Sequence, residues 1–291
     1  MFQGRWKIGF TPYFTGDTEE AIEVLAKEGY DGIEWSAYQH FKTAEDLKQL
    51  ARATRDRGLE VSDLMCSRDL VSGNESVRNE RVNSIIEKLE FAREASVKQI
   101  NLFTGPTDWA SKEFGENTQV VRIGKDIKEA KAWENVLWAF GKIVDAAQKN
   151  SVLVTVEPAF GMLVKDYYTL REFLENFNSK YLAVNFDPSH PALYGNDVAL
   201  AARRLGKRIR HIHVKDVIGK PGIIGEDFTF PRLGEGIIDW KDFFNALREI
   251  DYNDFLSIEY EPDNYIRNIW GGDWTIAAHE AKIELERLLS L

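Results

Sequence analysis

Short apolar runs rich in β-branched residues alternate with longer amphipathic segments along the whole chain. In residues 17–27, for example, Ala21, Ile22 and Leu25 recur at the spacing of one helical face. Several of the short runs are apolar on both faces, which is typical of strands buried in a parallel sheet. The predicted strands are 6–10, 32–36, 60–65, 99–104, 153–157, 182–187, 209–214 and 255–260, and the predicted helices are 17–27, 44–57, 76–95, 132–149, 170–177, 198–205, 240–249 and 275–289.

The repeated strand–helix order predicts an α/β fold, a (β/α)8 TIM barrel that forms a single domain over residues 1–291. Barrels of this kind usually span about 250 residues before insertions, which suits this chain. A doubly wound open sheet is the alternative. It is disfavoured because Thr11-Pro12-Tyr13-Phe14 follows the first strand, where such folds carry a Gly-rich phosphate turn.

Composition and charge exclude several classes of protein. The 47 acidic and 37 basic residues give a formal net charge of −10, which works against binding to nucleic acid or anionic membranes. Cys66 is the only cysteine, so an intrachain disulfide and a thiolate-only metal cluster are excluded. No apolar stretch approaches the roughly 18 residues that a spanning helix needs. We therefore expect a cytoplasmic protein without a membrane or nucleic-acid partner.

Ligand-type side chains end four consecutive predicted strands: Glu157, Asp187, His213 and Glu259. The carboxyl ends of barrel strands point at one central spot, so we expect these groups to converge. Three carboxylates cannot lie ionised together in a partly dry pocket without a compensating cation. An oxygen-rich set with one imidazole suits one divalent ion, Mn²⁺ in first place, with Mg²⁺, Co²⁺ or Zn²⁺ as alternatives.

These strand ends resemble those of the xylose-isomerase-like TIM-barrel superfamily. Within it, they are most similar to the sugar phosphate isomerase/epimerase branch, which includes ketose 3-epimerases and inosose dehydratases. The similar segments are Val156-Glu157-Pro158, Asp187-Pro188-Ser189-His190, His211-Ile212-His213-Val214-Lys215-Asp216, Leu233-Gly234-Glu235-Gly236 with Ile237-Ile238-Asp239-Trp240, and Ser257-Ile258-Glu259-Tyr260-Glu261.

The resemblance implies a sugar isomerase or epimerase whose metal is held by Glu157, Asp187, His213 and Glu259. It also implies that Glu157 and Glu259 serve as acid and base on opposite faces of a metal-stabilised enediolate, and that His190 contacts the substrate. A lyase that dehydrates a keto-sugar or keto-cyclitol at the same site is the first alternative. A carbohydrate-binding barrel without turnover is the second. The expected partner is a small-molecule sugar or keto-sugar, and a homo-oligomer is compatible with the sequence.

Some positions differ from those of related enzymes. Leu163 stands where ketose 3-epimerases often carry a Glu, and Gly219 where they often carry an Arg, which argues against a simple ketohexose substrate. Apurinic endonucleases of this fold need several extra histidines for a three-metal site. The chain has five histidines in all, and its predicted third and fourth strands end without one, which argues against DNA repair.

Two residues of the predicted strands are interpreted mainly as structural. Glu34 ends the second strand, and we expect a salt-bridge acid in the barrel mouth, with a substrate contact as the alternative. His211 precedes His213 by two residues. We expect it to point to the opposite side of the strand and to serve as a packing or supporting residue.

The remaining substrate-binding candidates are two cations and two aromatic residues. Lys215 and Arg232 lie on the presumed active face, where a phosphate or carboxylate on the substrate would need a cation. Trp109 and Phe160 could form apolar walls against the C–H surface of a sugar. Trp109 and Arg232 belong to two long predicted loops, 105–131 and 216–238, which either contribute to the site or are surface loops.

Overall fold

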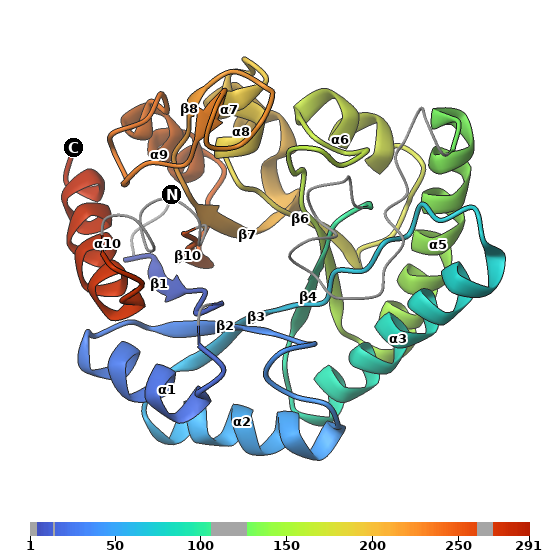
Figure 1. Cartoon of the computed structure of the whole chain (residues 1–291), viewed down its shortest axis with the longest axis horizontal. Helices are drawn as coiled ribbons and strands as arrows, with labels where there is room; N and C mark the ends of the chain where they lie inside the picture. Colours follow the sequence, from blue (N-terminus) through green and yellow to red (C-terminus); the bar gives the residue numbers. More distant parts are fainter. Residues whose placement is uncertain (1–4, 14, 106–126, 261–269) are drawn as a thin grey trace.

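The computed structural model describes residues 5–13, 15–105, 127–260 and 270–291. In these residues, eight parallel strands close into one barrel and helices surround it, as Figure 1 shows. The predicted single-domain (β/α)8 TIM barrel is therefore confirmed. The barrel strands are β1 (Lys7–Phe10), β2 (Gly32–Ser36), β3 (Glu60–Met65), β4 (Gln99–Leu102), β5 (Leu153–Val156), β6 (Leu182–Asn185), β7 (Ile209–Val214) and β10 (Phe255–Ile258).

The strands follow one another around the barrel in sequence order, and β1 pairs with both β2 and β10 to close it. Outside them lie the helices that the apolar spacing predicts, with ends that differ by up to three residues. They are α1 (Thr18–Lys27), α2 (Ala44–Asp56), α3 (Glu75–Glu94), α5 (Glu129–Asn150), α6 (Tyr167–Leu174), α8 (Val198–Leu205), α9 (Trp240–Glu249) and α10 (Trp274–Leu289).

Local side-chain chemistry sets where several of these helices begin. Thr43 and Asp166 each form a capping box, in which the cap side chain and the third helical residue exchange hydrogen bonds. Asp17 accepts from the backbone amides of Glu19 and Glu20 at the start of α1. Such caps satisfy amides that have no partner within the helix.

Strands β5 and β6 end earlier than predicted. Pro158 and Pro188 stand shortly after their last paired residues, and proline has no N–H with which to continue a ladder. Glu157 and Asp187 therefore lie within two residues of the last residues of β5 and β6, at the carboxyl face. The backbone N–H of Glu157 still donates to Leu102 at 3.0 Å, which keeps its position tied to the barrel.

The structure also contains short elements that the pattern does not predict. These are α7 (Ser189–Leu193), a 3₁₀ turn (Gly206–Arg208), and the two-residue strands β8 (Ile218–Gly219) and β9 (Phe228–Thr229), which form a small antiparallel hairpin. The hairpin belongs to an excursion, residues 216–238, that connects β7 to α9. Elements this short carry too few residues to produce a recognisable period.

Polar residues fill the inside of the barrel, although several of the predicted strands read as apolar on both faces. Hydrogen bonds join strands that are not neighbours, such as β2 to β7 and β4 to β7, and these bonds must cross the interior. Along β6, for example, the polar residue Asn185 alternates with the apolar residues Val184 and Phe186, and all three are buried. Here the apolar neighbours lie on the opposite face from Asn185, whose amide contacts Glu157 and His213.

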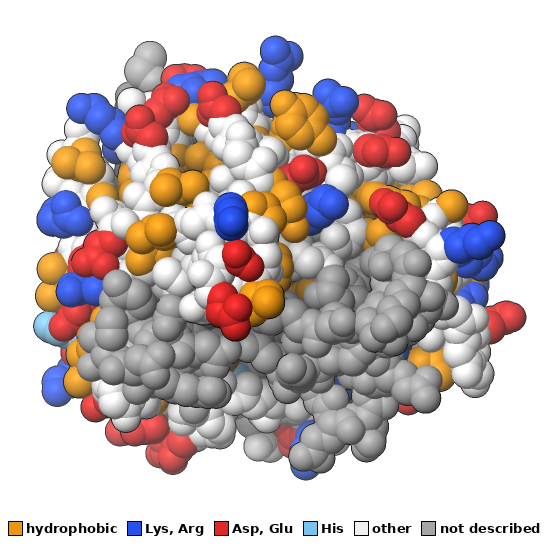
Figure 2. Space-filling model, turned by 45° about the horizontal axis from the view of Figure 1, so that its top comes forward, with side chains coloured by type: hydrophobic (Ala, Val, Ile, Leu, Met, Phe, Trp, Pro, Cys, Tyr) orange, Lys and Arg blue, Asp and Glu red, His pale blue; other side chains and the backbone are white. Residues whose placement is uncertain are grey.

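The outer surface mixes charges of both signs. In the view of Figure 2, acidic and basic side chains are interspersed, with hydrophobic side chains between them. Among the described residues, no helix has the length and apolarity required to cross a bilayer.

Asp216 organises the base of the excursion that follows β7. One carboxylate oxygen accepts from the backbone amides of Gly234 and Gly236 at 3.0 and 3.1 Å and from the Trp240 indole at 2.9 Å. The other accepts from the amide of Val217 at 2.9 Å. This buried carboxylate therefore joins the two ends of the excursion, and it leaves no room for a side chain at Gly236.

We predict that Gly236→Ala destabilises the protein, because its new methyl group would overlap the Asp216 carboxylate. Overpacking of this kind costs about 1–3 kcal/mol, measurable by urea unfolding. Gly16→Ala is the matched control, since a methyl group there would have no atom within 4 Å. Equal stability of Gly236→Ala and the wild type would contradict the role given to Asp216.

Candidate functional site

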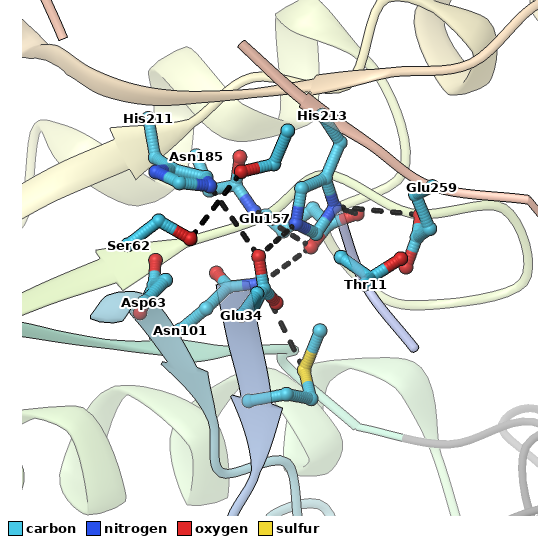
Figure 3. A network of polar contacts seen from close by, with 12 residues as sticks. Thr11, Glu34, Ser62, Asp63, Asn101, Glu157, Asn185, His211, His213 and Glu259 are labelled. Carbon is cyan, nitrogen blue, oxygen red and sulfur yellow. Dashed lines mark hydrogen bonds and ion pairs between the residues drawn. The ribbon is translucent and has the colours of Figure 1, made fainter. Parts of the chain in front are cut away.

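The four ligand-type residues predicted at successive strand ends lie together. Glu157, Asp187, His213 and Glu259 each offer one ligand atom, and these four atoms all lie within 4.8 Å of one another. The residues come from the ends of β5, β6, β7 and β10, and all four are buried. Figure 3 shows Glu157, His213 and Glu259 directed toward one another.

His213 stands at the centre of this group, with acidic side chains on both sides of its ring. Its Nδ1 lies 3.2 Å from Glu157 Oε1 and 3.3 Å from Glu259 Oε2, and its Nε2 lies 2.8 Å from Glu34 Oε2. Burial alone would lower the pKa of His213, but the charges of Glu157, Glu34 and Glu259 raise it well above its ordinary value.

Lys215 supplies a second positive charge inside the site. Its Nζ lies 2.9 Å from Asp187 Oδ2 and 2.6 Å from Glu259 Oε2, and its side chain is buried. The ammonium group also lies 4.8 Å from the centre of the Phe230 ring. Lys215 therefore joins two of the acidic residues, and the prediction that it binds substrate remains a prediction.

The two glutamates have different surroundings. Glu157 Oε2 accepts hydrogen bonds from the amides of Asn101 and Asn185 at 2.5 and 3.1 Å. Burial, reinforced by Glu259 and Asp187, raises the pKa of Glu157 to about 7 against the effect of His213. For Glu259, burial alone would raise the pKa, but Lys215 and then His213 lower it well below the ordinary value. The pKa values of two similar carboxyl groups are therefore shifted in opposite directions.

Glu34 lies on the barrel axis below these groups and is fully buried. Burial alone would raise its pKa, but the charge of His213 and hydrogen bonds from His211 and His213 lower it to about 2. The prediction that His211 points away from His213 is wrong, because side chains two residues apart share one face of a strand. His211 Nε2 lies 3.3 Å from the same Glu34 oxygen that His213 contacts.

His190, which follows Asp187 by three residues, is also buried in the site. Its Nε2 lies 3.4 Å from Asp187 Oδ2, and its ring meets Phe230 edge-on at 5.6 Å. Burial lowers the pKa of His190 to about 4, although Asp187 opposes this shift. The imidazole is therefore neutral near neutral pH and can either donate or accept a hydrogen bond.

The other predicted substrate contacts lie at the border of the site or outside the described residues. Phe160 packs edge-on against Phe228 of the excursion, with ring centres 4.7 Å apart. Arg232 pairs with Glu284 and Glu280 of α10 at 2.5 and 3.0 Å, so this guanidinium already has acidic partners away from the four ligand-type groups. Trp109 lies outside the described residues.

Sequence reasoning missed Asn101, Asn185 and Phe230. The two asparagines bind the Glu157 carboxylate, and Phe230 contacts both Lys215 and His190. A signal for Asn185 does exist, because it precedes Asp187 by two residues and so shares its face of the chain. Phe230 has no such signal, because it comes from a loop whose path does not follow from periodicity.

The donor set fits a divalent cation. It combines three carboxylates and one imidazole, a mixture that suits Mn²⁺, Mg²⁺, Co²⁺ or Zn²⁺. Asp187 Oδ2 is buried and lies 2.9 Å from the Lys215 ammonium, so this oxygen already faces a positive charge. A buried carboxylate oxygen of this kind is suited to accept a cation.

Comparisons with known proteins agree with the fold. A family model described as "Xylose isomerase-like TIM barrel" matches residues 22–288. An inosose dehydratase of Clostridium perfringens is 22% identical, over 92% of this chain and 94% of that protein. An L-ribulose 3-epimerase structure has a TM-score of 0.75 at 21% identity, covering 98% and 95% of the two chains. The IolI protein, solved with a zinc atom, has a TM-score of 0.76 at 19% identity and covers 98% of each chain.

We predict that Lys215→Met lowers the stability of the metal-free protein, because it leaves Asp187 and Glu259 without their shared cation. Removing one partner of a buried ion pair typically costs about 3–5 kcal/mol. Chemical unfolding in the presence of a chelator measures this change. Lys131→Met, which removes an exposed pair with Glu134, is the control and should change stability little. A Lys215→Met variant as stable as wild type would refute this role.

Proposed function

The chain belongs to the xylose isomerase-like TIM-barrel family, and from that premise we propose that it is a metal-dependent enzyme of the isomerase/epimerase type. It moves a proton on the carbon next to the carbonyl of a small sugar or keto-sugar. The observation that carries this proposal is the convergence of four ligand-type groups within 4.8 Å at the carboxyl ends of four barrel strands. The carboxyl face is where TIM-barrel enzymes assemble their active sites.

Glu157, Asp187, His213 and Glu259 would hold the divalent ion in this proposal. The zinc atom of the IolI structure supports a divalent metal, since the two proteins share the fold. When bound, such an ion stabilises the negative charge that develops on the substrate oxygen as the neighbouring C–H is deprotonated. Lys215 limits the repulsion between Asp187 and Glu259 and holds these two side chains near each other.

Glu157 and Glu259 are the proposed proton-transfer pair. They lie on either side of the His213 ring nitrogen Nδ1, at 3.2 and 3.3 Å. A substrate that lies between them would have one carboxyl group on each side, so one can remove a proton and the other can return one. Asn101 and Asn185 hold the Glu157 carboxylate from behind, which fixes its direction.

His190, Lys215 and the aromatic residues would position the substrate. The neutral His190 imidazole can hydrogen-bond a hydroxyl group, and its place beside Asp187 keeps it next to the proposed metal site. Phe160 offers an apolar surface for C–H groups. Leu163 and Gly219 cannot provide the carboxylate and guanidinium that hold free hydroxyls in ketose 3-epimerases, which supports a substrate other than a simple ketohexose.

A dehydratase acting on a keto-sugar or keto-cyclitol is the second candidate. The full-length similarity to an inosose dehydratase favours it, at 22% identity over 92% of this chain. Both reactions begin with removal of a proton beside a carbonyl by a carboxylate. They differ in whether a hydroxyl group then leaves the adjacent carbon, so the same pair of glutamates serves either reaction.

We predict that the purified protein binds about one divalent ion per chain through Glu157, Asp187, His213 and Glu259. Elemental analysis of the protein as purified, and thermal unfolding with Mn²⁺, Co²⁺, Mg²⁺ or Zn²⁺ added after chelation, measure this binding. A ligand that binds only the folded state raises its stability. The absence of both stoichiometric metal and thermal stabilisation would contradict the proposed site.

We predict that Glu157→Gln and Glu259→Gln each lower turnover by about 10²–10⁴-fold, because each removes a positioned acid or base. The substrate panel consists of keto-sugars and keto-cyclitols in deuterated water. Deuterium uptake with mass otherwise conserved indicates epimerisation, and loss of water indicates dehydration.

Glu134→Gln, which changes an exposed glutamate, serves as the control for these two variants. Wild-type turnover in both Glu157→Gln and Glu259→Gln, with metal bound, would show that these residues are not the proton-transfer pair. Wild-type protein that binds metal but exchanges no proton of any substrate would support a binding protein instead.

A further inference from the structure

Glu34 is a buried carboxylate that contacts the imidazoles of both β7 histidines, and the proposed proton transfer does not use it. Its Oε2 lies 2.8 Å from His213 Nε2 and 3.3 Å from His211 Nε2. We propose that Glu34 is a positioning residue: it keeps the hydrogen of His213 on Nε2, so that Nδ1 is the atom available to the metal. This inference rests on the proposed metal site and assigns Glu34 a role within it.

The geometry around His213 shows why the acceptor on Glu34 matters. In the described part of the chain, Nε2 faces two groups, the carboxylate of Glu34 at 2.8 Å and the amide nitrogen of Asn185 at 3.1 Å. The carboxylate can only accept from Nε2–H, whereas an amide nitrogen can only donate to a bare Nε2. Because these two neighbours demand opposite tautomers, the shorter and charged contact decides the position of the hydrogen.

The surroundings of Nδ1, on the opposite side of the His213 ring, show why the position of the hydrogen matters. Nδ1 faces Glu157 Oε1 at 3.2 Å and Glu259 Oε2 at 3.3 Å, both of which are acceptors. Without Glu34, the donor amide of Asn185 on one side and the two carboxylates on the other would all favour a hydrogen on Nδ1. That hydrogen would point at the two glutamates and would have to be displaced before a cation could bind. Glu34 opposes this arrangement.

His211 has donors and acceptors arranged in the same way as His213, and its partners lie farther from the four ligand-type groups. Gln99 Nε2, which donates, lies 3.0 Å from Asp63 Oδ2 and 3.1 Å from His211 Nδ1. His211 Nδ1 therefore accepts, and its hydrogen lies on Nε2, toward Glu34. Figure 3 shows Glu34 rising from β2 toward the two β7 imidazoles. Both rings thus direct Nε2 at one Glu34 oxygen, His213 through a hydrogen bond and His211 through a 3.3 Å contact without an aligned hydrogen bond.

A second metal ion at Glu34, His211 and His213 is the competing interpretation, since their ligand atoms also lie within 4.8 Å of one another. It would require both Nε2 atoms to be free of hydrogen. Gln99 opposes this for His211, because it places the hydrogen of the neutral ring on Nε2. It would also require His213 to serve two ions with its two nitrogens. The hydrogen bond from His213 to the carboxylate, with His211 Nε2 at 3.3 Å from the same oxygen, explains this geometry without a second ion.

The test compares Glu34→Met and Glu34→Gln with the wild type. Met keeps the volume and removes the acceptor, whereas Gln keeps one acceptor oxygen and removes the charge. Loss of a carboxylate that orients a metal-binding histidine typically weakens metal affinity by about 10–100-fold. We expect this loss for Glu34→Met and a smaller loss for Glu34→Gln, measured by titration with Zn²⁺. Ser62→Ala is the matched control, because Ser62 is a buried polar residue of β3 whose contact is to Ser257.

Nitrogen-15 NMR of the histidine rings in the zinc-loaded proteins gives a readout that a merely structural role would not change. In the wild type, His213 should show a hydrogen on Nε2 and coordination through Nδ1, and the Nε2–H signal should weaken or shift in Glu34→Met. Unchanged zinc affinity and an unchanged His213 spectrum in both Glu34 variants would overturn the inference while leaving the proposed function intact. Two zinc ions per wild-type chain, with one lost in Glu34→Met, would make Glu34 a ligand and also overturn it.

A wild-type protein that binds no zinc would contradict the proposed function itself, and this inference with it. The outcomes therefore separate the two failures. If Glu34→Met does not fold, the comparison between Glu34→Gln and Ser62→Ala decides the matter by the same two measurements.

Discussion

Negative charge buried along the barrel axis is the constraint to which the rest of the site responds. Glu34, Glu157, Asp187 and Glu259 are all buried, and a buried carboxylate without partners costs several kcal/mol. The interior therefore carries amides, imidazoles and the ammonium group of Lys215 where many barrels carry layers of branched apolar side chains. These donors come from other strands than the carboxylates that they contact. They therefore fix the orientation of each carboxylate side chain. The arrangement of side chains in the site thus follows from the need to give each buried carboxylate a hydrogen-bond donor or a cation.

Much of the fold and the four strand-end groups could be predicted from the sequence, because both follow from short-range patterns. Strand and helix periods place the eight units, and polar residues next to Pro158 and Pro188 mark where β5 and β6 end. The polar interior could not be read in the same way. Asn185 and Val184 are equally buried, and only closure of the barrel decides which of them faces the axis.

Two adjacent residues after β7 also have roles that could not be predicted from the sequence. Lys215 and Asp216 are consecutive, charged and buried, yet one joins the carboxylates of the site and the other holds a loop. The sequence contains both charges but not the path of the excursion that supplies Phe230 and the amides of Gly234 and Gly236. Long-range packing decides such roles, and residues such as Phe160 acquire their partners only through it.

Groups at the strand ends and groups in the loops contribute differently to the choice between epimerisation and dehydration. Relatives of this chain include proteins named as dehydratases, and proteins of the same fold include epimerases. Strand-end groups can serve either chemistry, whereas the fate of the neighbouring hydroxyl depends on groups that loops supply. Leu163 and Gly219, which bear on the proposed substrate class, both lie in such connections.

The contacts of Asp216 affect which sequence changes this protein can accept during evolution. Its carboxylate fastens both ends of the excursion to the barrel, so the intervening hairpin of β8 and β9 is attached at a fixed base. Substitutions or length changes at the hairpin tip are therefore buffered from Lys215, the neighbouring residue in the chain. Mutation can therefore explore new surface chemistry at the hairpin tip, whereas Phe230, which follows β9 and contacts both Lys215 and His190, stays tied to the charged centre of the barrel.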